Sequence, residues 1–121
     1  MQQILTLADN PIMELHKNDL VKNEVMNLIH FDTCCELIEH ILTKRSDLVV
    51  IDIDYLKDRT IKLMRVIKLL NDSMRVVLLC SEENIRQLKE ALSFGVVAYL
   101  MKPFNEKEFS KILDNLTIAH H

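Results

Sequence analysis

The sequence predicts an α/β fold: a doubly wound sheet of five parallel strands with helices on both faces. Runs such as Val49-Val50-Ile51 and Val76–Leu79 are hydrophobic at every position rather than at alternate ones. This pattern is typical of parallel strands that helices cover on both faces. The strand patterns alternate with helical patterns, and no linker, repeat or low-complexity stretch interrupts them. Such alternation implies right-handed crossovers and helices on both sheet faces.

The size and composition suit one domain with a single core, since the chain has 121 residues and 49% of them are hydrophobic. We expect this domain over residues 1–117. Residues 118–121 are expected to be a short tail, either a linker or a tag remnant, because it ends in His120-His121.

The charge and the cysteines limit the class of protein. A net charge of -3 gives no broad basic field, so direct nucleic-acid binding is not expected. The amino terminus lacks a signal-peptide pattern, and no apolar run approaches a membrane span. Three cysteines do not make a disulfide framework. These features predict a cytoplasmic protein.

Each of the five expected strands is a short apolar run. The fifth follows the only glycine of the chain. The expected strands are Ile4–Ala8, Val25–His30, Leu48–Ile53, Arg75–Cys80 and Val96–Met101.

The five expected helices carry apolar residues at helical spacing and have recognisable start and stop signals. Asp32 and Asn105 are good N-caps, and the Ser81 hydroxyl is followed by carboxylates that favour a helix N-terminus. Asn71-Asp72 should end the third helix, and Gly95 stands where the fourth needs a left-handed residue. The expected helices run from Pro11 to about Lys22, Asp32 to Lys44-Arg45, Ile61 to Leu70, Ser81 to about Phe94, and Asn105 to Leu116.

Four of the apolar runs end in residues that can do chemistry: Asp9, Asp52, Cys80 and Lys102-Pro103. Because the carboxyl ends of parallel strands meet along one edge, where open α/β sheets bind ligands, these side chains are predicted to share one pocket. The acidic strand ends favour a cation there.

With these residues in these places, the chain resembles the receiver domains of two-component response regulators over about residues 2 to 117. The resemblance is carried by Ala8-Asp9, Asp52, Cys80 and Lys102-Pro103 at four successive strand ends, and most specifically by the stretch from Ala91 to Phe104. It implies a flavodoxin-like (βα)5 fold with strand order 2-1-3-4-5.

The resemblance also implies a phosphoryl-transfer site rather than an enzyme acting on other substrates. Asp52 would accept a phosphoryl group from a histidine kinase or phosphotransfer protein. Mg2+ would be bound by Asp9, Asp52 and the backbone carbonyl of Asp54. Lys102 would hold the phosphoryl oxygens, and the Lys102-Pro103 bond is expected to be cis.

The partners implied by the resemblance are that kinase, an output domain or effector protein, and a second copy bound through the fourth helix, fifth strand and fifth helix. By resemblance, Tyr99 is the aromatic residue whose rotation accompanies activation; the alternative is a structural tyrosine that anchors the sheet edge.

Several positions depart from the family pattern. Ala8 replaces the first of two acids, so weaker metal affinity is expected. Cys80 replaces a hydroxyl that would report the phosphoryl group, and a thiol is only a weak donor. Neighbouring carboxylates should raise the pKa of Cys80. The loop after Asp52 lacks the usual proline and glycine, and its Asp54 and Asp58 either partly replace the lost acid or are solvated.

Two hypotheses therefore remain. The first is a phosphorylatable receiver, favoured by the presence of Asp9, Asp52 and Lys102 together. The second is a pseudo-receiver, a phosphorylation-independent interaction module, in line with Ala8, Cys80 and the altered loop. A flavin- or dinucleotide-binding protein is rejected because no glycine- or hydroxyl-rich phosphate loop follows the first strand.

Overall fold

The computed structural model describes residues 2–8, 26–44 and 46–118. Asp9, the helix expected from Pro11 to about Lys22, and the tail at His120-His121 lie outside the described residues.

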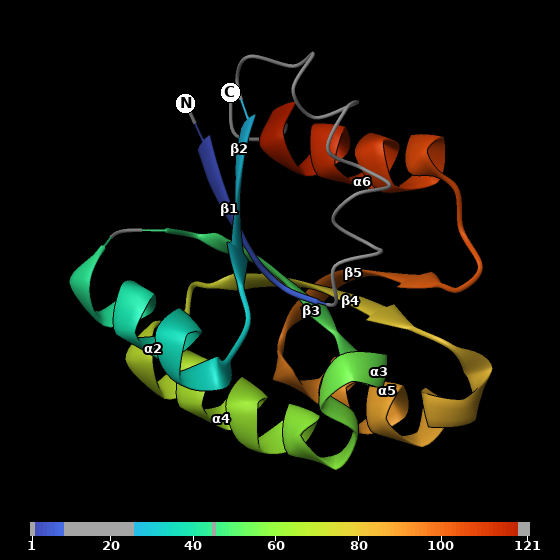
Figure 1. Cartoon of the computed structure of the whole chain (residues 1–121), viewed down its shortest axis with the longest axis horizontal. Coiled ribbons are helices and arrows are strands. Elements are labelled where there is room, and N and C mark those ends of the chain that lie inside the picture. The colour runs from blue at the N-terminus through green and yellow to red at the C-terminus, as the bar shows by residue number, and fades with distance from the viewer. Residues whose placement is uncertain (1, 9–25, 45, 119–121) are drawn as a thin grey trace.

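Five parallel strands form one sheet in the order β2-β1-β3-β4-β5. This arrangement confirms the predicted fold class and strand order. Figure 1 shows the strands side by side in the middle of the molecule. Their bounds are β1 Gln2–Leu7, β2 Met26–Phe31, β3 Leu48–Asp52, β4 Arg75–Cys80 and β5 Val96–Met101.

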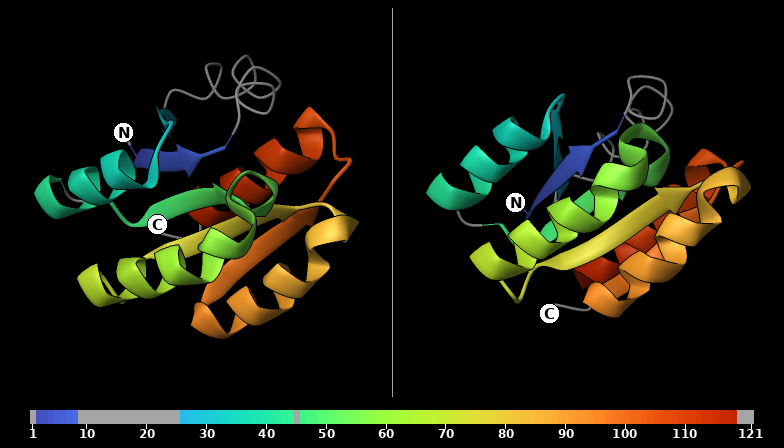
Figure 2. Two further views of the ribbon diagram at one scale, coloured as in Figure 1. Left: turned by 60° about the horizontal axis from the view of Figure 1, so that its bottom comes forward. Right: turned by 90° about the horizontal axis from the view of Figure 1, so that it is seen from below.

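Helices lie on both faces of the sheet. In Figure 1, α2, α4 and α5 are on one side and α6 is on the other, and both views of Figure 2 show the same layers. The described helices are α2 Cys34–Thr43, α3 Ile53–Leu56, α4 Thr60–Leu70, α5 Ile85–Ala91 and α6 Glu106–Ile118. Short 3-10 turns flank them: η1 Lys57–Arg59, η2 Glu82–Asn84 and η3 Leu92–Phe94.

The sheet separates two apolar cores, which explains the continuous hydrophobic runs. Along β3, Val49 and Ile51 pack into the core beneath α2, α4 and α5, whereas Leu48 and Val50 pack into the core beneath α6. Because side chains alternate between the faces of a strand, a strand covered on both sides must be apolar at every position. All five residues of β3 are buried.

Several helix ends match the sequence signals. The Asn105 side chain accepts a hydrogen bond from the Glu108 N–H at 2.9 Å and caps α6. Asn71 is the C-cap of α4, and Gly95 adopts the expected left-handed conformation with φ 77°. A left-handed residue turns the chain from η3 into β5 without the penalty that a Cβ would carry.

Two predicted caps are wrong. Helix α2 is capped by Thr33, not Asp32: the Thr33 Oγ1 accepts from the Glu36 N–H at 3.1 Å, and the Thr33 hydroxyl donates to the Glu36 carboxylate at 3.0 Å. Thr33 is favoured because Glu36 lies three residues on and can pair with its hydroxyl. Ser81 makes no side-chain cap bond either, because its hydroxyl binds Asp54 instead.

Three strands also differ from their predicted bounds. Strand β1 begins two residues and ends one residue earlier than expected, and β2 ends one residue later. Strand β3 ends at Asp52 because Ile53 already begins the short helix α3. The end of β3 is the difference that matters, since it places the Asp52 carboxylate directly at the strand-to-helix turn.

Candidate functional site

Asp52 lies at the carboxyl end of the central strand β3 and is fully buried. Its two carboxylate oxygens are 2.9 and 3.0 Å from the Lys102 Nζ. Lys102 directly follows β5, and its backbone N–H donates to the Cys80 carbonyl at 2.8 Å, which holds the ends of β4 and β5 together. The Lys102-Pro103 peptide bond is cis. The structure thus brings the predicted acceptor and the predicted phosphate clamp into direct contact.

The side chain of Asp54 is a second acceptor in the same site. One oxygen, Oδ2, is 3.0 Å from the Lys102 Nζ. The other, Oδ1, accepts hydrogen bonds from the Ser81 N–H at 3.1 Å, the Ser81 hydroxyl at 2.9 Å and the Asn84 side-chain amide at 2.8 Å. Lys102 therefore lies between two carboxylates, and one of them is tied to the segment that enters α5.

From the sequence, Asp54 is expected to act through its backbone carbonyl, or as an acid that partly replaces the one absent at Ala8 or is solvated. A signal was available: a second acid two residues after Asp52, and two polar residues, Ser81 and Asn84, just after β4. It was insufficient because the partners are 27 and 30 positions away in the sequence.

The protonation equilibria of these groups reflect burial and hydrogen bonding. Burial raises the pKa of Asp52, and the hydrogen bond from Lys102 only partly opposes this. Burial also raises the pKa of Asp54, but the hydrogen bonds from Asn84, Ser81 and Lys102 outweigh it and leave that pKa lowered. For Lys102, burial lowers the pKa, but the bonds to Asp52 and Asp54 prevail and raise it. The ammonium is thus held in its charged form.

Ala8 directly follows β1, the strand that flanks β3 on the side away from β4 and Lys102. It is 2% exposed within the core beneath α6. Its methyl group supplies no oxygen ligand. Within the described residues, no group of three His, Cys, Asp or Glu side chains could hold a metal ion. Asp9, the predicted metal ligand at this end of the site, lies outside them.

The donor set nevertheless fits a hard cation in kind. Two carboxylates, those of Asp52 and Asp54, share the single ammonium of Lys102, which leaves one negative charge uncompensated among these three groups. Oxygen ligands and residual negative charge are what Mg2+ prefers.

Cys80 is buried at the end of β4, in the core beneath α2, α4 and α5. Its Sγ contacts the Ser81 carbonyl at 3.0 Å rather than the Asp52 carboxylate. Burial, followed by the nearby Asp54 carboxylate, raises the pKa of this thiol to about 11, so it is not a reactive nucleophile at neutral pH.

The loop after Asp52 folds into α3 and η1. Tyr55 joins it to the end of β2 by donating a hydrogen bond from its hydroxyl to the Asp32 carbonyl at 2.6 Å. Asp58 is exposed. Lys57 has φ 53°, the one positive φ at a non-glycine position in the described part of the chain.

Tyr99 lies on the edge strand β5 and is 49% exposed. Its exposure leaves both earlier readings open: a switch aromatic and a structural residue of the sheet edge.

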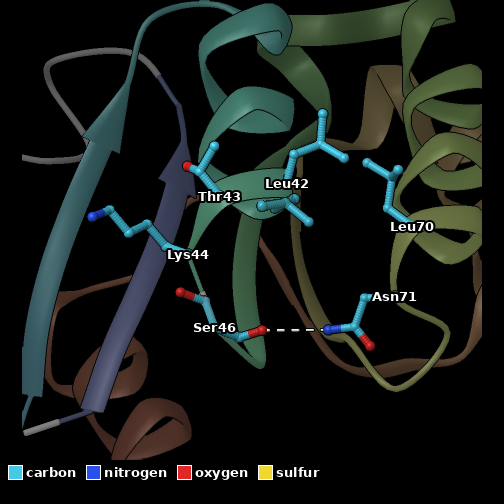
Figure 3. Close-up of a pocket in the computed structure, with 7 residues that line it drawn as sticks. Leu42, Thr43, Lys44, Ser46, Leu70 and Asn71 are labelled. Carbon is cyan, nitrogen blue, oxygen red and sulfur yellow. Dashed lines mark hydrogen bonds between the residues drawn. The ribbon is translucent and has the colours of Figure 1, made fainter.

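A cavity of about 270 Å3 occurs away from this site, between the carboxyl-terminal ends of α2 and α4. Figure 3 shows Leu42 and Leu70 facing each other across it, and the Asn71 side chain bonded to the Ser46 carbonyl below. None of the predicted site residues lines this cavity. No helix in the described part of the chain is long and apolar enough to cross a bilayer.

The comparisons with known proteins agree with this fold. The model of the response regulator receiver domain matches residues 4–114, and the chain therefore belongs to that family of two-component signalling domains. Transcriptional regulatory protein MalR of Bacillus subtilis is 26% identical over 117 residues, which are 95% of this chain and 50% of MalR. The chain thus spans half the length of this relative.

Solved structures share the fold at low identity. A response regulator from Thermotoga maritima has a TM-score of 0.81 at 19% identity, covering 95% of this chain and 96% of that one. Full-length FixJ from B. japonicum has a TM-score of 0.78 at 18% identity, covering 94% of this chain and 56% of that one. A third structure is the receiver domain of sensor histidine kinase PA1611 from Pseudomonas aeruginosa PAO1, with a magnesium ion in its active-site cleft. Its TM-score is 0.73 at 19% identity, covering 94% of this chain and 95% of that one.

Proposed function

We propose that this receiver domain accepts a phosphoryl group on Asp52 in a magnesium-dependent reaction and passes the signal to a partner or output domain. The observation that carries the proposal is the fully buried Asp52 carboxylate, held at 2.9 and 3.0 Å by the Lys102 ammonium at the carboxyl edge of a parallel sheet. Burying an ion pair costs desolvation free energy that a pair of apolar side chains would not, so its presence here favours a chemical role.

In the proposed reaction, one Asp52 oxygen attacks the phosphorus of a phosphohistidine or of a small phosphodonor. The new O–P bond forms as the P–N bond of the phosphohistidine, or the bond between phosphorus and the leaving group of a small donor, breaks. With the phosphohistidine, the imidazole nitrogen leaves with the bonding electron pair and takes up a proton from solvent. The product is an aspartyl phosphate, an acyl phosphate. Lys102 lies where negative charge gathers on the phosphoryl oxygens and can stabilise it electrostatically.

For the metal, we propose that Asp52, the backbone carbonyl of Asp54 and Asp9 hold Mg2+. When bound, the ion would neutralise charge between the acceptor and the donor phosphate. Ala8 removes one carboxylate that relatives would offer, so we expect weaker binding than in receivers with two acids at this place. The magnesium ion in the PA1611 receiver domain supports the assignment of the metal.

The donor we propose is a histidine kinase or phosphotransfer protein of the cytoplasm. A regulatory output is supported by the description of MalR as a transcriptional regulatory protein of twice the matched length. For association between copies, the proposed place is the surface of α5, β5 and α6. On α5, the turn η3 and β5, the side chains of Ile85, Leu92, Val97 and Tyr99 are 36 to 49% exposed.

A pseudo-receiver is the second candidate. It is favoured by the site's departures: the buried methyl of Ala8, the Cys80 thiol directed to the Ser81 carbonyl, and an Asp54 carboxylate already placed on Lys102 and Ser81. In that case the domain would bind its partner without phosphorylation.

Intact mass after incubation with magnesium and a small phosphodonor separates the two. A gain of one phosphoryl group in the wild type and in Asp58→Ala, absent in Asp52→Ala and absent without magnesium, supports the receiver. Asp58 is a matched control because it is an exposed acid on the same loop. No adduct from small donors and none from a panel of histidine kinases would leave the pseudo-receiver.

A further inference from the structure

The Lys102 ammonium is shared between two carboxylates that serve different parts of the molecule. Asp52 ends β3 in the buried floor of the site, whereas Asp54 lies two residues further on, in α3, with 20% of its side chain exposed. Both carboxylates contact Lys102 at 2.9 to 3.0 Å. Anything that draws Lys102 towards Asp52 therefore takes a partner from Asp54.

Asp54 is in turn the anchor of the segment between β4 and α5. Its Oδ1 accepts from the Ser81 N–H, the Ser81 hydroxyl and the Asn84 side-chain amide. Asn84 immediately precedes Ile85, the first residue of α5. Asn84 is the N-cap residue of α5 but makes no side-chain capping bond to its own helix, and its side-chain NH2 donates to Asp54 instead. The position of the α5 start thus depends on Asp54.

We propose that the Asp54 carboxylate relays the phosphorylation state of Asp52 to the start of α5 by competing for Lys102. The relay rests on the proposed function, because it needs a phosphoryl group on Asp52. A phosphoryl group carries close to two negative charges and three strong acceptor oxygens. These oxygens take over the ammonium of Lys102, and the added negative charge repels the Asp54 carboxylate beside it. Asp54 moves, and its bond to Asn84 is lost.

This route does not use the residue at the end of β4. The Cys80 thiol is a weak donor, it is buried, and it contacts the Ser81 carbonyl. The strong donors near the acceptor are those that Asp54 already binds. The physical requirement for a switch, two sites biasing one element between two arrangements, is met by Asp54 with Lys102 on one side and Asn84 on the other.

A purely structural Asp54 would also stabilise the loop, so the test must measure coupling. Nuclear magnetic resonance of the Asn84 side-chain amide and the Ile85 methyl group reports the two ends of the final link. Intact mass on the same samples reports the phosphoryl group. The variants are Asp54→Ala, which removes the acceptor, Asp54→Asn, which keeps the shape without the charge, and the control Asp58→Ala.

The expected result has three parts. In the wild type and in Asp58→Ala, phosphorylation moves the Asn84 amide signal to the position that it has in resting Asp54→Ala, and the Ile85 methyl signal moves with it. In those molecules of Asp54→Ala that carry the phosphoryl group by intact mass, neither signal moves further. Asp54→Asn behaves like Asp54→Ala in its Ile85 response, because the charge that Lys102 and the phosphoryl group act on is gone.

Other results overturn the relay. If the wild type is phosphorylated and the Asn84 and Ile85 signals stay in place, or if Asp54→Ala keeps the wild-type Ile85 movement, the relay is wrong while the acceptor role of Asp52 stands. If both Asp54 variants fold but gain no phosphoryl group, Asp54 belongs to the acceptor chemistry and not to a relay. A wild type that gains no phosphoryl group from any donor overturns the proposed function and the relay together.

Discussion

The two sides of the carboxyl edge differ sharply in the charged groups that they carry. At the ends of β3, β4 and β5, two carboxylates, one ammonium and the polar groups of Ser81 and Asn84 form a connected network. At the end of β1, Ala8 is 2% exposed among apolar side chains. The groups proposed to hold a phosphoryl group are thus present, whereas Ala8, which we propose weakens the metal site, is part of the core. The two proposed functions can therefore be tested separately.

The largest effect on stability is expected from removing the Lys102 ammonium on the charged side. Lys102→Met leaves Asp52 buried without its cation, which should lower the free energy of unfolding by about 3–5 kcal/mol. Urea denaturation measures this change. Lys107→Met, at an exposed lysine of α6, is the control and should change stability by no more than about 0.5 kcal/mol.

The double variant Asp52→Asn/Lys102→Met sharpens this test. Because it removes both charges, it should lose less stability than Lys102→Met alone. Equal losses for the Lys102 and Lys107 variants would mean that the Asp52 carboxylate is not dependent on its ammonium.

The second prediction places an acid at position 8, on the other side of the edge. Ala8→Asp places a carboxylate in an apolar core, so without magnesium the variant should be less stable than the wild type by about 1–3 kcal/mol or more. If the new carboxylate reaches the metal, magnesium should raise its melting temperature more than that of the wild type, by mass action.

Calorimetry with and without a chelator measures both effects in Ala8→Asp. Ala8→Asn has nearly the same shape without the charge and serves as the control. A magnesium response no larger than that of Ala8→Asn would contradict the view that Ala8 weakens the metal site.

A smaller effect on stability is expected from pH, which should act differently on the contributions of Asp52 and Asp54. The folded-state pKa of Asp54 is lowered from 3.8, so its stabilisation is present above pH 3.8 and is lost as pH falls through the lowered value. The folded-state pKa of Asp52 is raised from 3.8, so its favourable contribution is present below pH 3.8 and is lost as pH rises through the raised value.

The stability differences between the wild type and the variants Asp54→Asn and Asp52→Asn should therefore change in opposite directions with pH. Urea midpoints from about pH 7 down to about pH 3 measure both. Two differences that change in the same direction would contradict the distinct roles of these carboxylates.

The smallest effect is expected in the labelling of Cys80, which ends β4 on the charged side. With a pKa of about 11, Cys80 has a thiolate fraction on the order of one in ten thousand at pH 7. Alkylation followed by peptide mass mapping should therefore modify Cys35, which is exposed, long before Cys80. Rapid labelling of Cys80 in the folded protein would show that the end of β4 is open to solvent.

Much of the fold was predictable because its signals are local. The β4 and β5 bounds, the left-handed Gly95 and the Asn105 cap follow from apolar runs and capping chemistry. The two wrong cap assignments arise where another hydrogen-bond partner competes for the capping role. Thr33 caps α2 instead of Asp32 because only Thr33 has Glu36 three residues ahead to pair with its hydroxyl. Ser81 does not cap because a carboxylate 27 residues away binds its hydroxyl.

The amino-acid sequence by itself determined the parallel five-stranded sheet, and with it the meeting of Asp52 and Lys102 at one edge. Continuous apolar runs can be buried only by covering both faces of the strands, and parallel strands bring their carboxyl ends together. Only the tertiary structure decided that Lys102 is shared between Asp52 and Asp54, that Asp54 anchors Ser81 and Asn84, and that Ala8 is buried in the core. Those contacts depend on distances between segments far apart in the chain, which no local pattern of residues records.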